Sequence, residues 1–317
     1  MKIPKRLKDL LDQKQAFIDS QRDQLSNTMV KLQSDLFSNI LSDIIPELDV
    51  KDGLILDTPK NYKLISLLDK TYKDFNVSST KILAEQVVGT VSLIVDYNTK
   101  YYNSVLGVLS ERFTKILAET KNLIDLKIGL TGDKVFKGGW LDSYFTASPV
   151  GTELKQIVSQ AVTSNMNKKE LIKILKSKIT GTKDYTGTLE RQFNMYAYDL
   201  YQQYDAAYNL TIGNEFGFNY FIYLGGLIDD SRDFCAAHNG KVWSKEEALT
   251  WKDWVPADGE YPEGWKVKQK DQYSHPGYMD VPGYDPFINR GGYHCRHKLG
   301  WIADELALKR RPELTKN

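Results

Sequence analysis

The sequence has little cysteine and no long hydrophobic run. Two cysteines in 317 residues exclude a disulfide scaffold and suit a reducing compartment. The longest apolar run, near Val87–Val95, is far shorter than the roughly 20 residues that a membrane-spanning helix needs. The basic N-terminus is not followed by an apolar core, so we expect a helix there and no secretion signal.

The sequence also lacks an excess of charge of one sign and the common catalytic motifs. Lys plus Arg number 42 and Asp plus Glu number 41, which gives a net charge of +1. A chain this balanced is not a general nucleic-acid coat, and any contact with DNA needs a local basic patch. The sequence contains no GxSxG, Walker A, HExxH or dinucleotide-binding pattern, so it offers no recognised catalytic signature.

Apolar residues recur mostly at spacings of three and four, which predicts a helical chain up to about residue 216. The expected helices span 5–48, 59–75, 79–121, 152–163, 167–179 and 189–216. The residue pattern then changes, and strands are expected at 219–224 and 241–243. Ser244 and Glu247 predict a capping box for a short helix, and residues 256–292 are expected to form a long loop. We therefore predict an α+β fold, with a mostly helical N-terminal region (1–125), a helical middle segment and linker (126–188) and a small loop-rich α+β C-terminal domain (189–317).

All four histidines and both cysteines lie between positions 235 and 297. Thiolate and imidazole are the ligands that zinc prefers, and a structural site needs four of them. Cys235 and His238 could supply one half of a zinc site, and Cys295 with His297, or His294, the other. Two alternatives stay open, namely plain packing of these side chains and a Cys235–Cys295 disulfide in oxidising conditions. A disulfide or a shared metal requires the two cysteines to lie close in space, and we expect that they do.

Two other patterns have a structural and a functional interpretation. Lys169, Lys173 and Lys176 share one face of the helix 167–179, which is typical of a solvated face but would also suit contact with DNA phosphates. The segment 123–200 holds 11 basic and 8 acidic residues, a net charge of +3, which motivates the DNA hypothesis. Tyr201, Tyr204 and Tyr208 repeat at helical spacing, and we interpret them as a packing stripe.

Residues 189–317 resemble the phage Mu protein F-like minor head protein family, also called the phage head morphogenesis domain. The resemblance rests on four blocks in order: the helix Arg191–Phe216, the strand NYFIYLGG, the segment from Asp230 to Gly240 with Cys235 and His238, and the ending Gly291–His297 followed by Leu299 and Trp301. The sequence departs from the commonest family ending, Pro-x-x-His-x-x-Cys-Arg-Cys, because His297 replaces the final cysteine and Gly292 the histidine.

The resemblance implies a structural minor head protein of a tailed phage, associated with the portal or the capsid interior. Such a protein acts in head assembly and in DNA packaging or ejection. It implies a location in the virion head after assembly in the host cytoplasm, with the portal protein, the major capsid protein and phage DNA as partners. Neither a membrane nor a small-molecule substrate is implied, nor enzymatic activity. The alternative is a hydrolase, nuclease or toxin module that uses the Cys/His cluster with zinc.

Arg296 matches the family position and is expected to be a structural anchor. Its planar guanidinium has five donors that could bind loop carbonyls or the carboxylates of Asp230 and Asp233. We expect it to be largely buried beneath the loop. Gly291 and Gly292 permit a backbone conformation that is closed to other residues.

Overall fold

The computed structural model describes residues 5–107, 111–132, 134–139, 142, 150–229, 231–254, 261–267, 284–292 and 295–316. It divides into two compact units, each built from separate stretches of chain. Unit 1 comprises 1–20, 90–125 and 198–317, and unit 2 comprises 21–89 and 126–197. Asp230 and His294 lie outside the described residues, as does His275.

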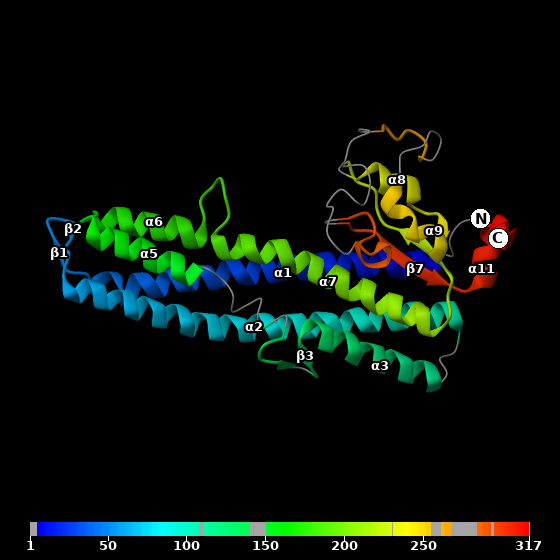
Figure 1. Cartoon of the computed structure of the whole chain (residues 1–317), viewed down its shortest axis with the longest axis horizontal. Coiled ribbons are helices and arrows are strands. Elements are labelled where there is room, and N and C mark those ends of the chain that lie inside the picture. Colours follow the sequence, from blue (N-terminus) through cyan, green and yellow to red (C-terminus); the bar gives the residue numbers. More distant parts are fainter. Residues whose placement is uncertain are drawn as a thin grey trace. The chain divides into compact units, whose positions relative to one another are not determined.

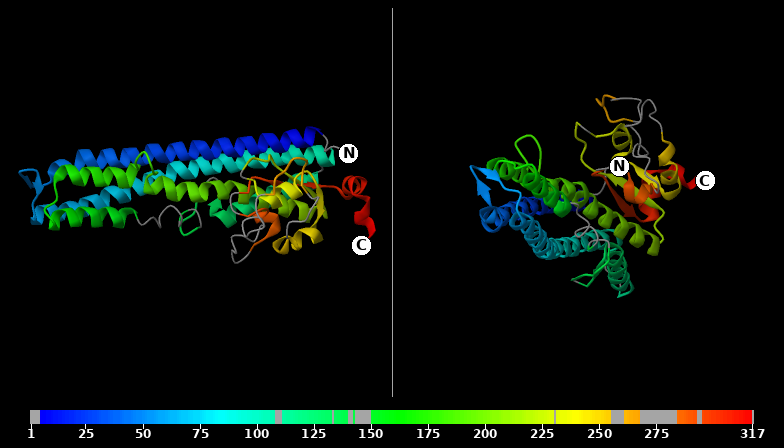
Figure 2. Two further views of the ribbon diagram at one scale, coloured as in Figure 1. Left: turned by 90° about the horizontal axis from the view of Figure 1, so that it is seen from above. Right: turned by 60° about the vertical axis from the view of Figure 1, so that its left-hand side comes forward.

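Long helices contribute to both units. They are α1 (Lys5–Asp43), α2 (Pro59–Leu106), α3 (Glu111–Ile128) and α7 (Thr188–Glu215). Unit 2 also contains α5 (Val150–Thr163) and α6 (Lys168–Thr180), which lie side by side (Figures 1 and 2). Its short elements are η1 (Ile45–Glu47) and the hairpins β1–β2 (Val50–Lys51, Leu54–Ile55) and β3–β4 (Leu130–Thr131, Lys134–Val135).

Unit 1 adds a three-stranded antiparallel sheet of order β6-β5-β7. Its strands are β5 (Tyr220–Leu224), β6 (Val242–Ser244) and β7 (Lys298–Ile302). Helix α7 lies against β7 (Figure 1), where a Cβ at Gly213 would be only 2.7 Å from the Trp301 ring. The remaining elements are α8 (Asp233–His238), α9 (Lys245–Leu249), η2 (Trp251–Asp253), α10 (Pro286–Asn289), α11 (Asp304–Arg310) and η4 (Pro312–Lys316).

The expected fold class is confirmed: the chain is mostly helical, and a small α+β part lies towards its C-terminus. The Ser244–Glu247 capping box is present, and Asn167 caps α6 by accepting a hydrogen bond from the backbone of Lys169. Tyr201, Tyr204 and Tyr208 are buried, as expected of a packing stripe. Among the described residues, no helix is both long and apolar enough to cross a bilayer.

The expected break between residues 75 and 79 is wrong, because α2 runs through it. The Ser78 and Ser79 hydroxyls donate to carbonyls three residues earlier, so these polar side chains are accommodated inside the helix. Helix α2 ends instead at Gly107, whose φ of +83° lies in the left-handed region that glycine adopts readily.

Candidate functional site: a buried cysteine and histidine cluster

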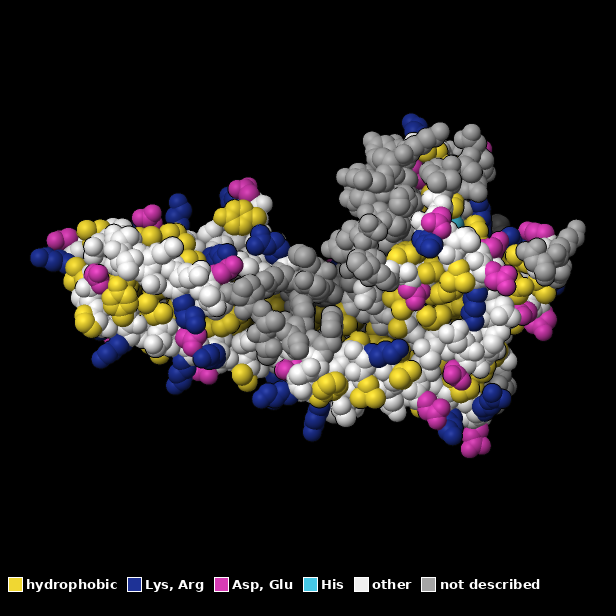
Figure 3. Space-filling model, in the orientation of Figure 1, with side chains coloured by type: hydrophobic (Ala, Val, Ile, Leu, Met, Phe, Trp, Pro, Cys, Tyr) yellow, Lys and Arg dark blue, Asp and Glu magenta, His cyan; other side chains and the backbone are white. Residues whose placement is uncertain are grey.

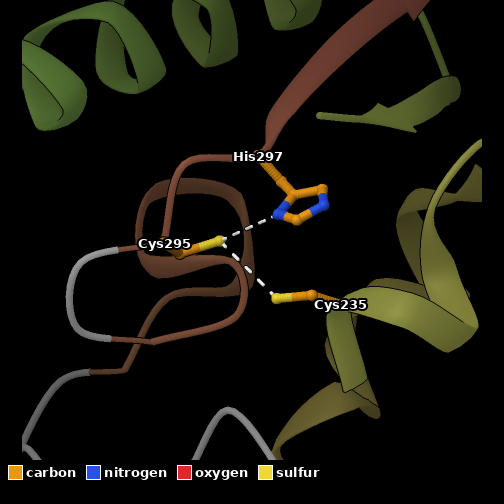
Figure 4. Close-up of side chains that lie close together, drawn as sticks. All are labelled: Cys235, Cys295 and His297. Atoms are coloured by element: carbon orange, nitrogen blue, oxygen red, sulfur yellow. Dashed lines mark hydrogen bonds between the residues drawn. The ribbon is translucent and has the colours of Figure 1, made fainter. Parts of the chain in front are cut away.

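Two distant stretches of unit 1 meet beside the central strand β5. Cys235 lies in the first turn of α8, whereas Cys295 and His297 lie just before β7 (Figure 4). Antiparallel pairing of Leu224 with Lys298 brings the start of β7 alongside the end of β5. This pairing places the second motif next to the first, although 60 positions separate the two cysteines.

The cluster is compact and closed. The two Sγ atoms are 4.0 Å apart, and the Sγ of Cys295 is 3.8 Å from Nδ1 of His297. The Tyr223 hydroxyl lies 3.4 Å from both sulfurs. A Cβ at Gly291 would be 2.5 Å from the Sγ of Cys235, so the glycine backbone closes tightly over the cluster. The expectation that Cys235 and Cys295 lie close in space is confirmed.

The surroundings shift the pKa values of the two thiols in opposite directions. The hydrogen bond to Cys295, together with burial, raises the pKa of Cys235 well above its ordinary value. Burial also opposes ionisation of Cys295, but hydrogen bonds from Cys235 and His297 and the charge of Arg290 outweigh it and lower its pKa well below the ordinary value. The two cysteines therefore differ in acidity, and Cys295 is the more acidic of the pair.

Cys235, Cys295 and His297 form a group that could hold a metal ion. Their ligand atoms all lie within 4.8 Å of one another. Bond lengths of about 2.3 Å to sulfur and 2.0 Å to nitrogen give tetrahedral edges of about 3.8 Å between two sulfurs and about 3.5 Å between sulfur and nitrogen. The observed separations of 4.0 and 3.8 Å are close to these edges.

His238 does not belong to this group, so the structure brings together three of the four expected ligands. Its ring is stacked between Phe234 and Trp243, with centroid distances of 3.8 and 4.4 Å, and Nδ1 donates to the Phe234 carbonyl. Burial lowers the pKa of His238 to about 3, which keeps the ring neutral inside its aromatic cage. The sequence spacing could not show this, because it does not reveal which way a side chain at the end of a short helix points.

Two of the expected anchor residues have partners that the sequence did not predict. Arg296 is 41% exposed, and its guanidinium pairs with the carboxylate of Asp19 in α1 at 2.5 Å, so the expected burial beneath the loop is wrong. Asp233 is buried and accepts a hydrogen bond from the Trp265 indole at 2.8 Å. Gly292 has a φ of +92°, which confirms the expected conformational role for this glycine, whereas Gly291 does not have a positive φ.

A second buried polar cluster lies in unit 1 and was not foreseen. The carboxylate of Asp205 in α7 pairs with Lys14 at 2.8 Å and with Lys298 at 3.0 Å, and all three side chains are buried. Asn98 and Asn209 also donate to the Asp205 carboxylate. A sequence signal existed, since Lys14 occupies a core position of the α1 stripe between Leu11 and Ile18.

No protein-family model, curated protein or solved structure matches the chain.

Proposed function

We propose that the protein is a structural minor head protein of a tailed phage, associated with the portal or the capsid interior and acting in head assembly. One observation carries the proposal. The blocks that resemble the phage head morphogenesis domain pack around the strand NYFIYL, and Cys235 meets Cys295 and His297 in a single cluster. Blocks brought together in this way behave as parts of one module, which supports the resemblance over a chance match.

Burial favours a structural role for the cluster over catalysis. Cys235, Cys295 and His297 are 3%, 5% and 3% exposed. A nucleophile and its base must reach a substrate, whereas a structural cluster gains from being closed. The hydrolase, nuclease or toxin alternative would need this cluster to open, and the close approach of Gly291 disfavours such movement.

The functional proposal is tested by following the chain through assembly. We expect it to co-sediment with the portal or major capsid protein encoded beside it and to be present in purified heads by mass spectrometry. Deleting its gene should yield malformed or non-infectious heads. Heads that form normally without this chain and never contain it would contradict the proposal.

A cysteine variant separates the structural from the catalytic role. For a structural cluster, Cys295→Ser should lower the melting temperature and impair assembly together, since both depend on the packed module. For an enzyme, the same change should abolish function while the melting temperature stays close to that of the unmodified chain. The second pattern would favour the hydrolase, nuclease or toxin alternative.

Within this proposal, zinc is the metal that the donor set favours, because thiolate sulfur and imidazole nitrogen are the ligands that it prefers. Zinc would cross-link α8 to the start of β7 and so stabilise the module. The three protein ligands leave one coordination position to be completed. The two alternatives are the metal-free thiol pair described above and a disulfide.

Metal analysis of the purified full-length chain decides among these states. We expect about one zinc per chain, a melting temperature that falls on chelation, and loss of the metal in Cys235→Ser. His238→Phe is the matched control, because it preserves the aromatic packing and lies outside the ligand group. A metal-free chain with two free thiols, or one whose mass shows a disulfide, would contradict the zinc assignment.

A further inference from the structure

A cleft of about 490 Å³ opens within unit 2, far along the chain from the cysteine cluster. It lies between α5, α6, the segment 181–187 and the first turn of α7. Its volume falls within the range of about 300–1,000 Å³ that is typical of small-ligand sites. Ile157 and Ile174 supply its apolar surface, and charged and hydroxyl side chains supply the rest.

Two cations from different elements line the cleft. Lys173 comes from α6 and Arg191 from α7, and both are exposed. Within the described part of the chain, neither forms an ion pair, whereas the neighbouring Lys178 is paired with Glu153 at 2.9 Å. Glu170 also lines the cleft, but the lining still carries more positive than negative charge. An anionic group would therefore be attracted into the cleft.

An aromatic ring lies at the edge of the same cleft. Tyr185 is 55% exposed, and its hydroxyl hydrogen-bonds Ser177 of α6 at 2.8 Å, which holds the ring in place. The turn that carries it is closed by a hydrogen bond from the Thr182 amide to the Tyr185 carbonyl and by pairing of Gly181 with Thr186. A fixed, exposed ring beside two cations provides a stacking surface next to an anion site.

We propose that this cleft binds a nucleotide unit, with its phosphate between Lys173 and Arg191 and its base against Tyr185. A free nucleotide and a nucleic-acid strand share this chemistry. The proposal does not depend on the role in head assembly. It also narrows the lysine-face hypothesis, because Lys173 lines the cleft whereas Lys169 and Lys176 do not.

The face of unit 2 drawn in Figure 3 gives no competing reason for strong anion binding. Figure 3 shows basic and acidic side chains interspersed over this face of unit 2, without an extended field of one sign. If nucleic acid were attracted only by the overall charge of this surface, binding should be weak. The loss of affinity should then be the same whichever lysine is removed. The cleft proposal predicts the opposite, a strong dependence on position.

The test uses the full chain, with AMP and a labelled oligothymidylate of about ten nucleotides as probes, followed by calorimetry and fluorescence anisotropy. The double variant Lys173→Gln/Arg191→Gln should weaken binding about tenfold or more. The control Lys169→Gln/Lys176→Gln removes the same charge outside the cleft and should stay within about twofold. Equal weakening in both double variants, or no binding of either probe, would overturn the proposal.

Tyr185 tests the base contact separately. Tyr185→Ala should weaken binding about fivefold or more through lost stacking, whereas Tyr185→Phe keeps the ring but loses the hydrogen bond to Ser177 and should weaken binding less. Circular dichroism of each variant verifies that unit 2 remains folded. Binding of AMP identifies a nucleotide site, and binding of the strand alone identifies the end or loop of a nucleic acid. An oligoglutamate peptide that binds as tightly as the strand, or unchanged binding by Tyr185→Ala, would refute the assignment.

Discussion

At the scale of residues, the most unusual feature is the pairing of two buried lysines with one buried aspartate. Burial lowers the pKa of Lys14, and it lowers the pKa of Lys298 to about 7, although Asp205 partly offsets this effect in both. Burial alone would raise the pKa of Asp205, but the two lysines and the Asn98 hydrogen bond lower it well below its usual range. The carboxylate therefore stays ionised, while the second ammonium carries an uncompensated cost of burial.

This arrangement makes the stability of the protein depend on pH in a specific direction. A lysine whose pKa is lowered on folding binds fewer protons in the folded than in the unfolded state, so stability rises with pH up to its unfolded value near 10.5. Lys14→Met removes one such group and raises the pKa of Lys298 by removing its neighbouring charge. Between pH 7 and 9, the free energy of unfolding of the variant should therefore rise less steeply with pH than that of the unmodified chain. The slope should fall by up to about 1.4 kcal/mol per pH unit, as measured by urea unfolding.

Asp205→Asn provides the contrasting variant. It leaves two buried lysines without their counter-ion, so it should destabilise the chain by about 3–5 kcal/mol at pH 7. Lys14→Met, by contrast, leaves a one-to-one pair and should stay within about 1 kcal/mol of the unmodified chain at pH 7. If Lys14→Met retained the full pH dependence, the two-lysine interpretation would be wrong.

Part of the candidate site was predictable from the sequence, namely the residues that the pairing of β5 with β7 brings together. Cys235, Cys295 and His297 were identified because ligand-type residues are confined to one part of the chain. The role of His238 could not be identified, since its ring orientation depends on Trp243 and on other aromatic residues distant in sequence. Arg296 was misjudged for a similar reason, because its partner Asp19 lies 277 positions away.

At the scale of elements, helices were predictable wherever their apolar spacing determines burial. The spacing in α1, α5, α6 and α7 corresponds closely to the observed helices, since each buries one stripe of side chains. The false break inside α2 comprised residues 76–78, between the expected helices 59–75 and 79–121. Those residues bond back to the helix or face solvent, and this local chemistry is invisible to periodicity.

Strand β7 was not predicted because nothing in its own sequence alternates. All five residues from Lys298 to Ile302 are buried, so the usual polar-out pattern is missing. Gly300, a residue type that is unfavourable in strands, is needed here for packing. A Cβ at this position would lie 2.8 Å from the Tyr101 hydroxyl and 3.1 Å from Leu11. The strand exists because β5 pairs with it, which is a non-local effect.

At the scale of the whole molecule, the compact units cut across the three consecutive segments 1–125, 126–188 and 189–317. Unit 1 draws its helices from residues 5–20 and 90–125 as well as from the C-terminal part. Residues 198–317 are therefore only part of unit 1, and residues 189–197 of the motif-bearing segment belong to unit 2. Sequence segmentation could not show this, because composition changes mark boundaries along the chain but not the stretches that pack together.

Residues 189–317 expressed alone should consequently fail to form a stable domain. The fragment keeps the sheet and Asp205 but loses Lys14 and Asn98, which satisfy that carboxylate. It also loses Leu11 and Tyr101, which pack against Gly300, and the hydrogen bond from the Tyr101 hydroxyl to the Trp301 carbonyl. Exposed apolar surface and a half-satisfied buried charge both oppose folding.

We expect the fragment to show weak near-ultraviolet circular dichroism and no cooperative melting transition, with recovery of both when residues 1–125 are supplied as a second chain. Residues 21–89, supplied as the second chain instead, should not provide this recovery, because Lys14, Asn98 and Tyr101 lie outside them. If the isolated fragment instead melted cooperatively within a few degrees of the full chain, residues 5–20 and 90–125 would not be needed to fold the motif-bearing segment. That result would contradict the division into two interleaved units.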